Sequence, residues 1–177
     1  MWLFKKKRNK NNKELYSEQF GKLVLEYNAQ ENRYFTKNSN NIFNEYNALI
    51  RIYDFKDKDI DKYIDALNYL FNHQESIIHD LKNVFMQHDF NDESIKSGFK
   101  LDSIEIIQVE KIKKELYENE EFKFYLDGLE DLELLLDNSS NDNLFTRIVA
   151  HIDNYEYYSF LYINNQNKDM CDCFEIF

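Results

Sequence analysis

Apolar residues recur every three to four positions through the first half of the chain, which is the spacing of helices that bury one face. In the segment 14–35 these positions are Leu15, Phe20, Leu23, Val24 and Tyr27. After the polar run 36–41, a second set comprises Ile42, Phe43, Tyr46, Leu49, Ile50 and Tyr53, and Ser39 or Asn40 is suited to cap its helix. A third set begins near Asp57 and continues to Phe85. The pattern predicts that residues 14–87 are mainly helical.

The middle of the chain is less regular. The polar stretch 91–100, which contains Gly98, predicts a loop and an internal boundary. Residues 104–118 fit either a helix or, in their first half, a strand, because periodicity does not separate the two in a run this short. Residues 129–137 are likewise open to either structure.

The last third has the composition of β-strands. Residues 144–152 and 155–163 are rich in β-branched and aromatic side chains, and only Asp153 and Asn154 separate them, which predicts a hairpin. A polar turn at 164–169 and a third strand from Met170 to Phe177 follow. The run that begins at Phe122 and ends before Gly128 indicates a further hairpin.

Together these segments predict an α+β fold in which three to four N-terminal helices pack on a C-terminal antiparallel β-meander. Residues 1–13 are expected to form a basic flexible tail. Residues 14–177 form one domain, with a helical part over about 14–118 and a β-rich part over about 122–177.

Composition narrows the function classes. The three glycines among 177 residues are isolated, which excludes the glycine-rich loops that cradle nucleotide phosphates. No apolar run approaches the length of about 18 residues that a transmembrane helix requires, and the N-terminus does not resemble a signal peptide. We therefore expect a water-soluble protein of the cytoplasm.

Charge is distributed unevenly along the chain. The formal net charge is −11, yet residues 1–13 hold six Lys or Arg and no acid. Residues 89–142 hold 16 acids and 6 bases. The negative electrostatic field of such an acidic segment attracts cationic partners and repels nucleic acid. The alternative is that the acidic surface serves only solubility.

These features favour a bacterial immunity protein or antitoxin, an acidic inhibitor that covers the active site of a basic toxin. Carboxylates would steer the toxin and tyrosines would anchor it. The predicted partner-binding residues are Glu118, Glu120, Glu121, Glu130, Asp131, Glu133, Tyr155 and Tyr157. No catalytic residues and no cofactor are predicted. The oligomeric state and the identity of the partner stay open.

Three other functions remain as alternatives. The chain could be an acidic DNA mimic that inhibits a nucleic-acid enzyme, or an enzyme that uses carboxylates or His151, which follows Arg147 on the same strand face. Residues 1–13 could make weak contact with a membrane surface, because Trp2, Leu3 and Phe4 precede a basic run.

The two cysteines, Cys171 and Cys173, lie on one face if their segment is a strand, and a disulfide between them would be strained. The four histidines show no metal-ligand spacing. No metal site is therefore predicted, and the cysteines are read as small buried side chains.

Overall fold

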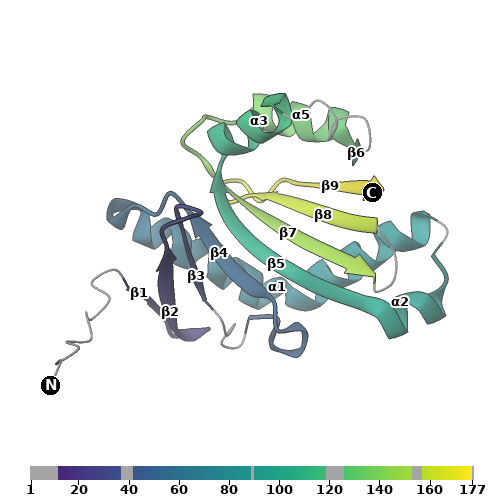
Figure 1. Ribbon diagram of the computed structural model, residues 1–177, viewed down its shortest axis with the longest axis horizontal. Helices are drawn as coiled ribbons and strands as arrows, with labels where there is room; N and C mark the ends of the chain where they lie inside the picture. Colours follow the sequence, from purple (N-terminus) through teal and green to yellow (C-terminus); the bar gives the residue numbers. More distant parts are fainter. Residues whose placement is uncertain (1–11, 37–41, 89, 119–125, 153–156, 177) are drawn as a thin grey trace, which may run out of the picture.

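The computed structural model describes residues 12–36, 42–88, 90–118, 126–152 and 157–176, whose strands form one mixed sheet (Figure 1). The strands are β1 (Lys13–Ser17), β2 (Gly21–Asn28), β3 (Arg33–Thr36), β4 (Leu49–Tyr53), β5 (Phe99–Gln108), β6 (Leu126–Asp127), β7 (Leu144–Ile152), β8 (Tyr157–Asn164) and β9 (Met170–Ile176). The helices are α1 (Ile60–Gln87), α2 (Asp92–Gly98), α3 (Val109–Glu118) and α5 (Leu129–Asp137), with short 3-10 turns η1 (Asn44–Tyr46) and η2 (Asp57–Asp59).

The strand order is β1-β2-β3-β4-β5-β7-β8-β9-β6. β1 to β4 form one antiparallel meander, and β5, β7, β8 and β9 form another. The two meanders join where β4 pairs with β5 in parallel. A parallel pair needs a crossover connection, and α1 and α2 supply it.

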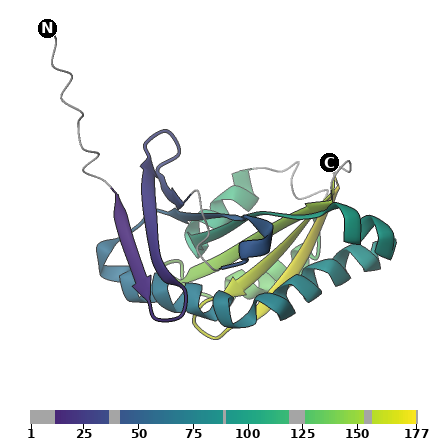
Figure 2. The ribbon, with the colours of Figure 1, turned by 90° about the horizontal axis from the view of Figure 1, so that it is seen from below.

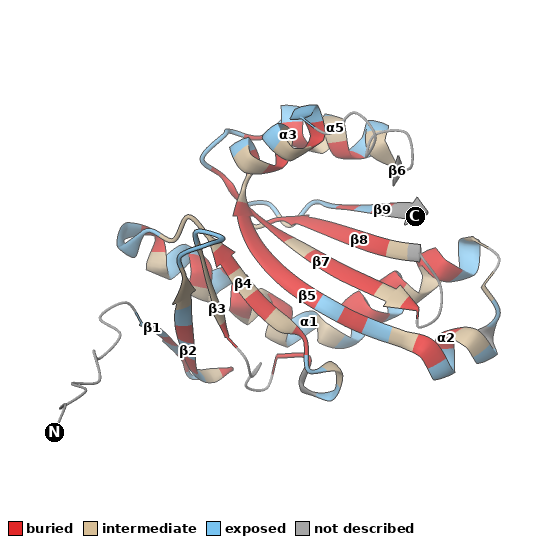
Figure 3. Cartoon of the chain, in the orientation of Figure 1, coloured by how far each residue is buried: buried red, intermediate tan, exposed pale blue. Residues whose placement is uncertain are grey.

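Helices cover both faces of the sheet. The long helix α1 lies along one face, and α3 and α5 lie over the opposite face beside β7, β8 and β9 (Figures 1 and 2). Because side chains alternate along a strand, β5 supplies Ile104 and Ile106 to the core under α1 and Ile107 to the core under α3 and α5. Buried residues accordingly run along the central strands β5, β7 and β8 (Figure 3).

The predicted order of helices first and strands afterwards is wrong. Residues 14–35 are strands: Leu15, Leu23 and Leu25 are buried at alternate positions within β1 and β2, whereas Val24 is exposed. The turn at residues 18–20 separates the two strands, and this offset makes the apolar spacing resemble a helical one. Within the predicted second helix, Ile50 and Ile52 of β4 also alternate with partly exposed residues.

The remaining predictions had mixed outcomes. α1 lies where a helix was expected, with a single non-helical residue, His73, inside it. The stretch 91–100 is helix α2 followed by the start of β5 rather than a loop. Residues 104–118 combine both alternatives, since β5 ends at Gln108 and α3 follows, and residues 129–137 are helix α5.

The C-terminal strands β7, β8 and β9 form the predicted antiparallel meander. The first eleven residues of the predicted tail, the turn at Asp153 and the beginning of the predicted hairpin at Phe122 lie outside the described residues. Lys13, the last residue assigned to the tail, is the first residue of β1 and pairs with Asp57 at 2.5 Å.

Candidate functional site

A row of charged side chains crosses the middle of the sheet on the face that carries α3 and α5. Arg51 of β4 is paired with Glu105 of β5, which in turn is paired with Arg147 of β7. Each lies between residues that point to the opposite, α1-covered face, so strand alternation alone brings the three together.

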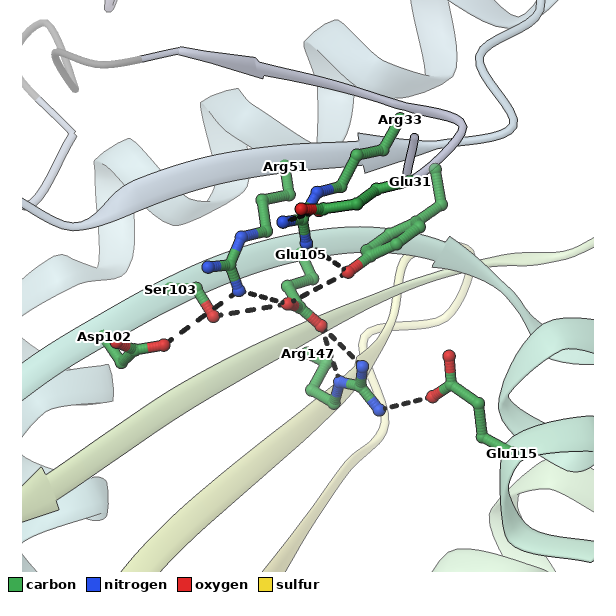
Figure 4. Close-up of polar contacts among 9 residues, drawn as sticks. Glu31, Arg33, Arg51, Asp102, Ser103, Glu105, Glu115 and Arg147 are labelled. Carbon is green, nitrogen blue, oxygen red and sulfur yellow. Dashed lines mark hydrogen bonds and ion pairs between the residues drawn. The ribbon is translucent and has the colours of Figure 1, made fainter. Parts of the chain in front are cut away.

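Hydrogen bonds join these three side chains into one network (Figure 4). Arg51 Nη1 donates to Glu105 Oε1 at 2.8 Å, and Arg147 donates to Glu105 Oε2 from Nε at 2.8 Å and from Nη2 at 2.6 Å. The Glu105 side chain is only 5% exposed, against 20% for Arg51 and 14% for Arg147. A buried carboxylate of this kind is stable only with such partners.

The network extends to neighbouring strands and to α3. Arg147 Nη1 donates to Glu115 Oε2 of α3 at 2.8 Å, and Arg33 Nη1 of β3 donates to the Tyr53 hydroxyl at 2.8 Å. Arg33 also forms an ion pair with Glu31. Every arginine of the cluster therefore has a carboxylate partner.

Electrostatics keep Glu105 ionised. Burial by itself would raise the pKa of its carboxyl, but the charge of Arg147 and the hydrogen bonds from both arginines outweigh burial and lower this pKa below its ordinary value. Because its charges are matched internally, the network acts as a structural element that fixes the register of β4, β5 and β7.

The same row of paired residues continues across β8 and β9, in the part of the sheet that α3 and α5 cover. Tyr162 of β8 pairs with Arg147, and Cys171 of β9 pairs with Tyr162. Tyr162 is 1% exposed, and burial raises the pKa of its hydroxyl to about 12 although the nearby Arg147 opposes the shift.

A second feature is an open groove of about 560 Å³ between α5, β9 and the C-terminal half of α1. Three aspartates line it: Asp131 of α5, Asp172 of β9, and Asp169, which immediately precedes β9. An adjoining hollow shares Val84, Gln87, Met170 and Asp172 with the groove and adds Asp80 of α1. Among the residues that the structure describes, no Lys or Arg lines either hollow.

Apolar side chains also reach this groove. Leu134 of α5 is 63% exposed and Met170 of β9 is 48% exposed, and both line it. Large exposed apolar side chains beside carboxylates are typical of surfaces that bind another protein.

The structure brings together three of the predicted partner-binding residues. Glu130, Asp131 and Glu133 lie on α5, and Asp131 lines the groove. Glu118 lies at the end of α3, where it pairs with Lys114 at 3.7 Å. Glu120, Glu121 and Tyr155 lie outside the described residues, and Tyr157 is the first residue of β8.

Sequence reasoning missed both the charged row and the aspartates of β9. A signal for the row exists: Arg51 and Glu105 each lie between two isoleucines, so each charge interrupts a run of apolar residues. Of the other candidates, His151 lies beside Tyr158 with ring centroids 5.5 Å apart, and Arg147 is committed to the network. The described residues contain no group of three or more metal-ligating side chains.

Fold and site thus define a class of protein: an α+β sheet protein with an internal arginine–glutamate network and an acidic groove at one sheet edge. No family model, curated protein or solved structure matches the chain. In the described part of the chain, the helices are too short or too polar to cross a membrane.

Proposed function

We propose that this protein is an acidic binding protein of the cytoplasm that neutralises a cationic protein, as an immunity protein or antitoxin covers a basic toxin. One observation carries the proposal. The groove between α5, β9 and α1 combines aspartates with exposed apolar side chains, and no Lys or Arg is among the described residues that line it.

The carboxylates of this surface are available to a partner. Glu130, Asp131 and Asp172 make no ion pair within the described residues, in contrast to Glu105, whose charge is matched internally. Unpaired carboxylates attract a basic surface over several ångströms and raise its association rate. This attraction weakens with salt, because the Debye length falls to about 8 Å at physiological ionic strength.

Leu134 and Met170 would supply the contact energy after the charges have aligned the partner. Both side chains protrude into solvent from rigid elements, a helix and a strand. An apolar centre with a polar rim is the usual anatomy of a protein interface.

The test uses the protein encoded beside this gene, expressed in bacteria as a candidate toxin with and without this chain. We expect the wild-type chain to restore growth and to bind the purified toxin more weakly at high salt. The triple variant Asp80→Asn/Asp131→Asn/Asp172→Asn removes three of the four aspartates that line the groove and the adjoining hollow, and it should lose both effects.

A matched control removes the same charge elsewhere. Asp61, Glu75 and Glu110 are exposed and lie outside the groove, so the variant Asp61→Asn/Glu75→Gln/Glu110→Gln should protect like the wild type. If both triple variants protect equally, or if the wild type neither protects nor binds, the proposal is wrong. If the chain instead inhibits an enzyme that acts on nucleic acid, and DNA competes with the chain for that enzyme, the protein is a DNA mimic.

A further inference from the structure

Strand β6 covers only one end of the outer edge of β9. It pairs with Phe174 and Glu175, near the C-terminal end of β9 (Figure 1). Gly128 then adopts a φ of +81° and α5 begins at the next residue, so the chain turns away from this edge. Among the described strands, none lies beside the rest of the edge, from Met170 to Asp172.

The backbone of this open edge directs hydrogen-bonding groups outward. The Asn164 N–H donates to the carbonyl oxygen of Asp169 at 2.8 Å, so Asp169 points its carbonyl towards β8. Because backbone groups alternate in direction along a strand, those of Met170 and Asp172 point away from β8. The position of Gly128 agrees, since a Cβ there would lie 2.6 Å from the carbonyl oxygen of Asp172. Met170 therefore offers a donor and an acceptor with no described strand beside them.

The open edge runs along the acidic groove, with a helix on each side of it. α5 flanks the edge on one face of the sheet, and the C-terminal half of α1 flanks it on the other. Asp172 alternates with Cys171 and Cys173, whose side chains pack in the core under α3 and α5, so Asp172 points to the α1 side. Asp80 of α1 lies on that side as well, whereas Asp131 lies on α5. Carboxylates thus flank the edge on both faces.

This arrangement fits an extended basic segment. A strand added to the edge would point successive side chains to alternate faces of the sheet. On the α5 side these side chains would meet Asp131 and Leu134, and on the α1 side they would meet Asp80, Asp172 and Met170. Lys or Arg at either set of positions would find a carboxylate, and apolar residues between them would find an exposed apolar side chain.

We propose that the groove binds an extended basic segment of the partner protein, which adds a strand beside residues 169–172 in line with β6. The segment's backbone pairs with the outward groups of Met170, and its Lys or Arg side chains pair with the aspartates. This inference rests on the proposed function, because it names the part of the cationic partner that the groove recognises. It adds that main-chain pairing contributes to binding alongside charge.

The probe is a capped peptide of alternating lysine and valine, added at low salt to the isotope-labelled full chain and followed by NMR. We expect amide shifts at residues 169–172 and nuclear Overhauser contacts between the backbone protons of the peptide and Met170. A second peptide of the same sequence, N-methylated at every backbone amide, keeps each side chain and charge but donates no backbone hydrogen bond. It should bind about tenfold more weakly or worse.

Two substitutions at one position test the same pairing from the protein side. Met170→Ser and Met170→Pro both remove the thioether side chain, but only the proline also removes the outward N–H. Proline is tolerated at the first residue of an edge strand when its nitrogen faces solvent, as at Met170. Met170→Pro should therefore bind the unmodified peptide about threefold to tenfold more weakly than Met170→Ser. The comparison of the two peptides decides the matter if the proline variant does not fold.

Charge has its own matched pair of variants. Asp80→Asn/Asp131→Asn/Asp172→Asn should lose binding of the unmodified peptide, and Asp61→Asn/Glu75→Gln/Glu110→Gln should keep it.

Three results would overturn the proposal: equal affinity for the two peptides, contacts that map away from residues 169–172, and no binding of the unmodified peptide. A chain that protects against the toxin yet binds both peptides equally would keep the proposed function without strand addition. A chain that binds only the unmodified peptide but neither protects against nor binds the toxin would lose the proposed function instead. The two failures are therefore distinguishable.

Discussion

Arg147 donates from both Nε and Nη2 to a single oxygen of Glu105, Oε2, from the directly paired position on the neighbouring strand. Arg51 holds the other oxygen from the opposite side. Glu105 is thus a buried acceptor that two arginines share, and we expect the stability of the central strands to depend on it more than on the exposed ion pairs.

Glu105→Gln should therefore be strongly destabilising. The amide keeps the shape but removes the buried negative charge, which leaves Arg147 with Glu115 alone and Arg51 with only Asp102 at 4.0 Å. We expect a loss of about 3–5 kcal/mol in the free energy of unfolding. Urea unfolding at neutral pH measures it. Glu115→Gln is the control: this carboxylate is 39% exposed and should cost less than about 1 kcal/mol. Equal losses for the two variants would show that burial does not matter here.

Acid should weaken the same network. Because the folded state lowers the pKa of Glu105 below 4.5, its stabilising contribution is complete above that value and is lost as the pH falls through the lowered pKa. Urea midpoints of the wild type should therefore fall more steeply with acidification than those of Glu105→Gln. Parallel curves for the two proteins would contradict this assignment.

At high pH, ionisation of Tyr162 should lower the stability of the fold. The unfolded tyrosine ionises near pH 10, whereas the folded hydroxyl keeps its proton until about 12, so its contribution to stability is present below pH 10 and is lost as the pH rises between these values. The expected slope is about 1.4 kcal/mol per pH unit. Tyr162→Phe should flatten this part of the stability curve, and an unchanged slope would mean that other groups cause it.

Gly128→Ala should separate α5 from β9. Gly128 has a φ of +81°, and a Cβ there would lie 2.6 Å from the carbonyl oxygen of Asp172. Gly21→Ala is a close control, because Gly21 has a φ of +79° and open space around the added carbon. Left-handed strain of about 1–2 kcal/mol is common to both variants, so thermal unfolding should show a clearly larger loss for Gly128→Ala. Similar losses would mean that α5 moves aside freely.

The apolar anchors of the groove give a prediction for binding. Leu134→Ser and Met170→Ser should each weaken binding to the toxin about tenfold or more, as expected for anchor residues. Their effect on stability should stay within about 0.5 kcal/mol, because both side chains are exposed. Tyr16→Ser, a 65% exposed position on β1 at the other sheet edge, is the control in the same calorimetric titration.

The success of sequence reasoning followed the length of each element. α1 runs through almost eight helical turns, so its period of 3.6 stands out, and β7 and β8 are long strands with a short connection. β1 has only five residues and a turn separates it from β2, so the alternation of the two strands is out of phase and was mistaken for a helical period. The positive φ of Gly21 marks that turn, but an isolated glycine does not by itself distinguish a turn from a helix.

The candidate site was predictable only in part. Asp131 was found because acids cluster along residues 129–137, and a helix places them on one exposed side. Asp172 of β9 lines the groove and Asp80 of α1 lines the adjoining hollow, and only the packing of α1, β9 and α5 brings these two aspartates near Asp131. Such a juxtaposition depends on tertiary structure and leaves no local pattern.

The parallel pairing of β4 with β5 also governs how the chain can be assembled. β4 ends at Tyr53, and its parallel partner β5 begins only at Phe99. During synthesis, the edge of β4 that pairs with β5 therefore has no hydrogen-bonding partner until α1, α2 and β5 have also emerged from the ribosome. Contacts of such long sequence separation form slowly, and an open strand edge invites association with other chains. Cotranslational folding of the N-terminal meander as a separate unit is therefore disfavoured, and a truncation before residue 108 should aggregate.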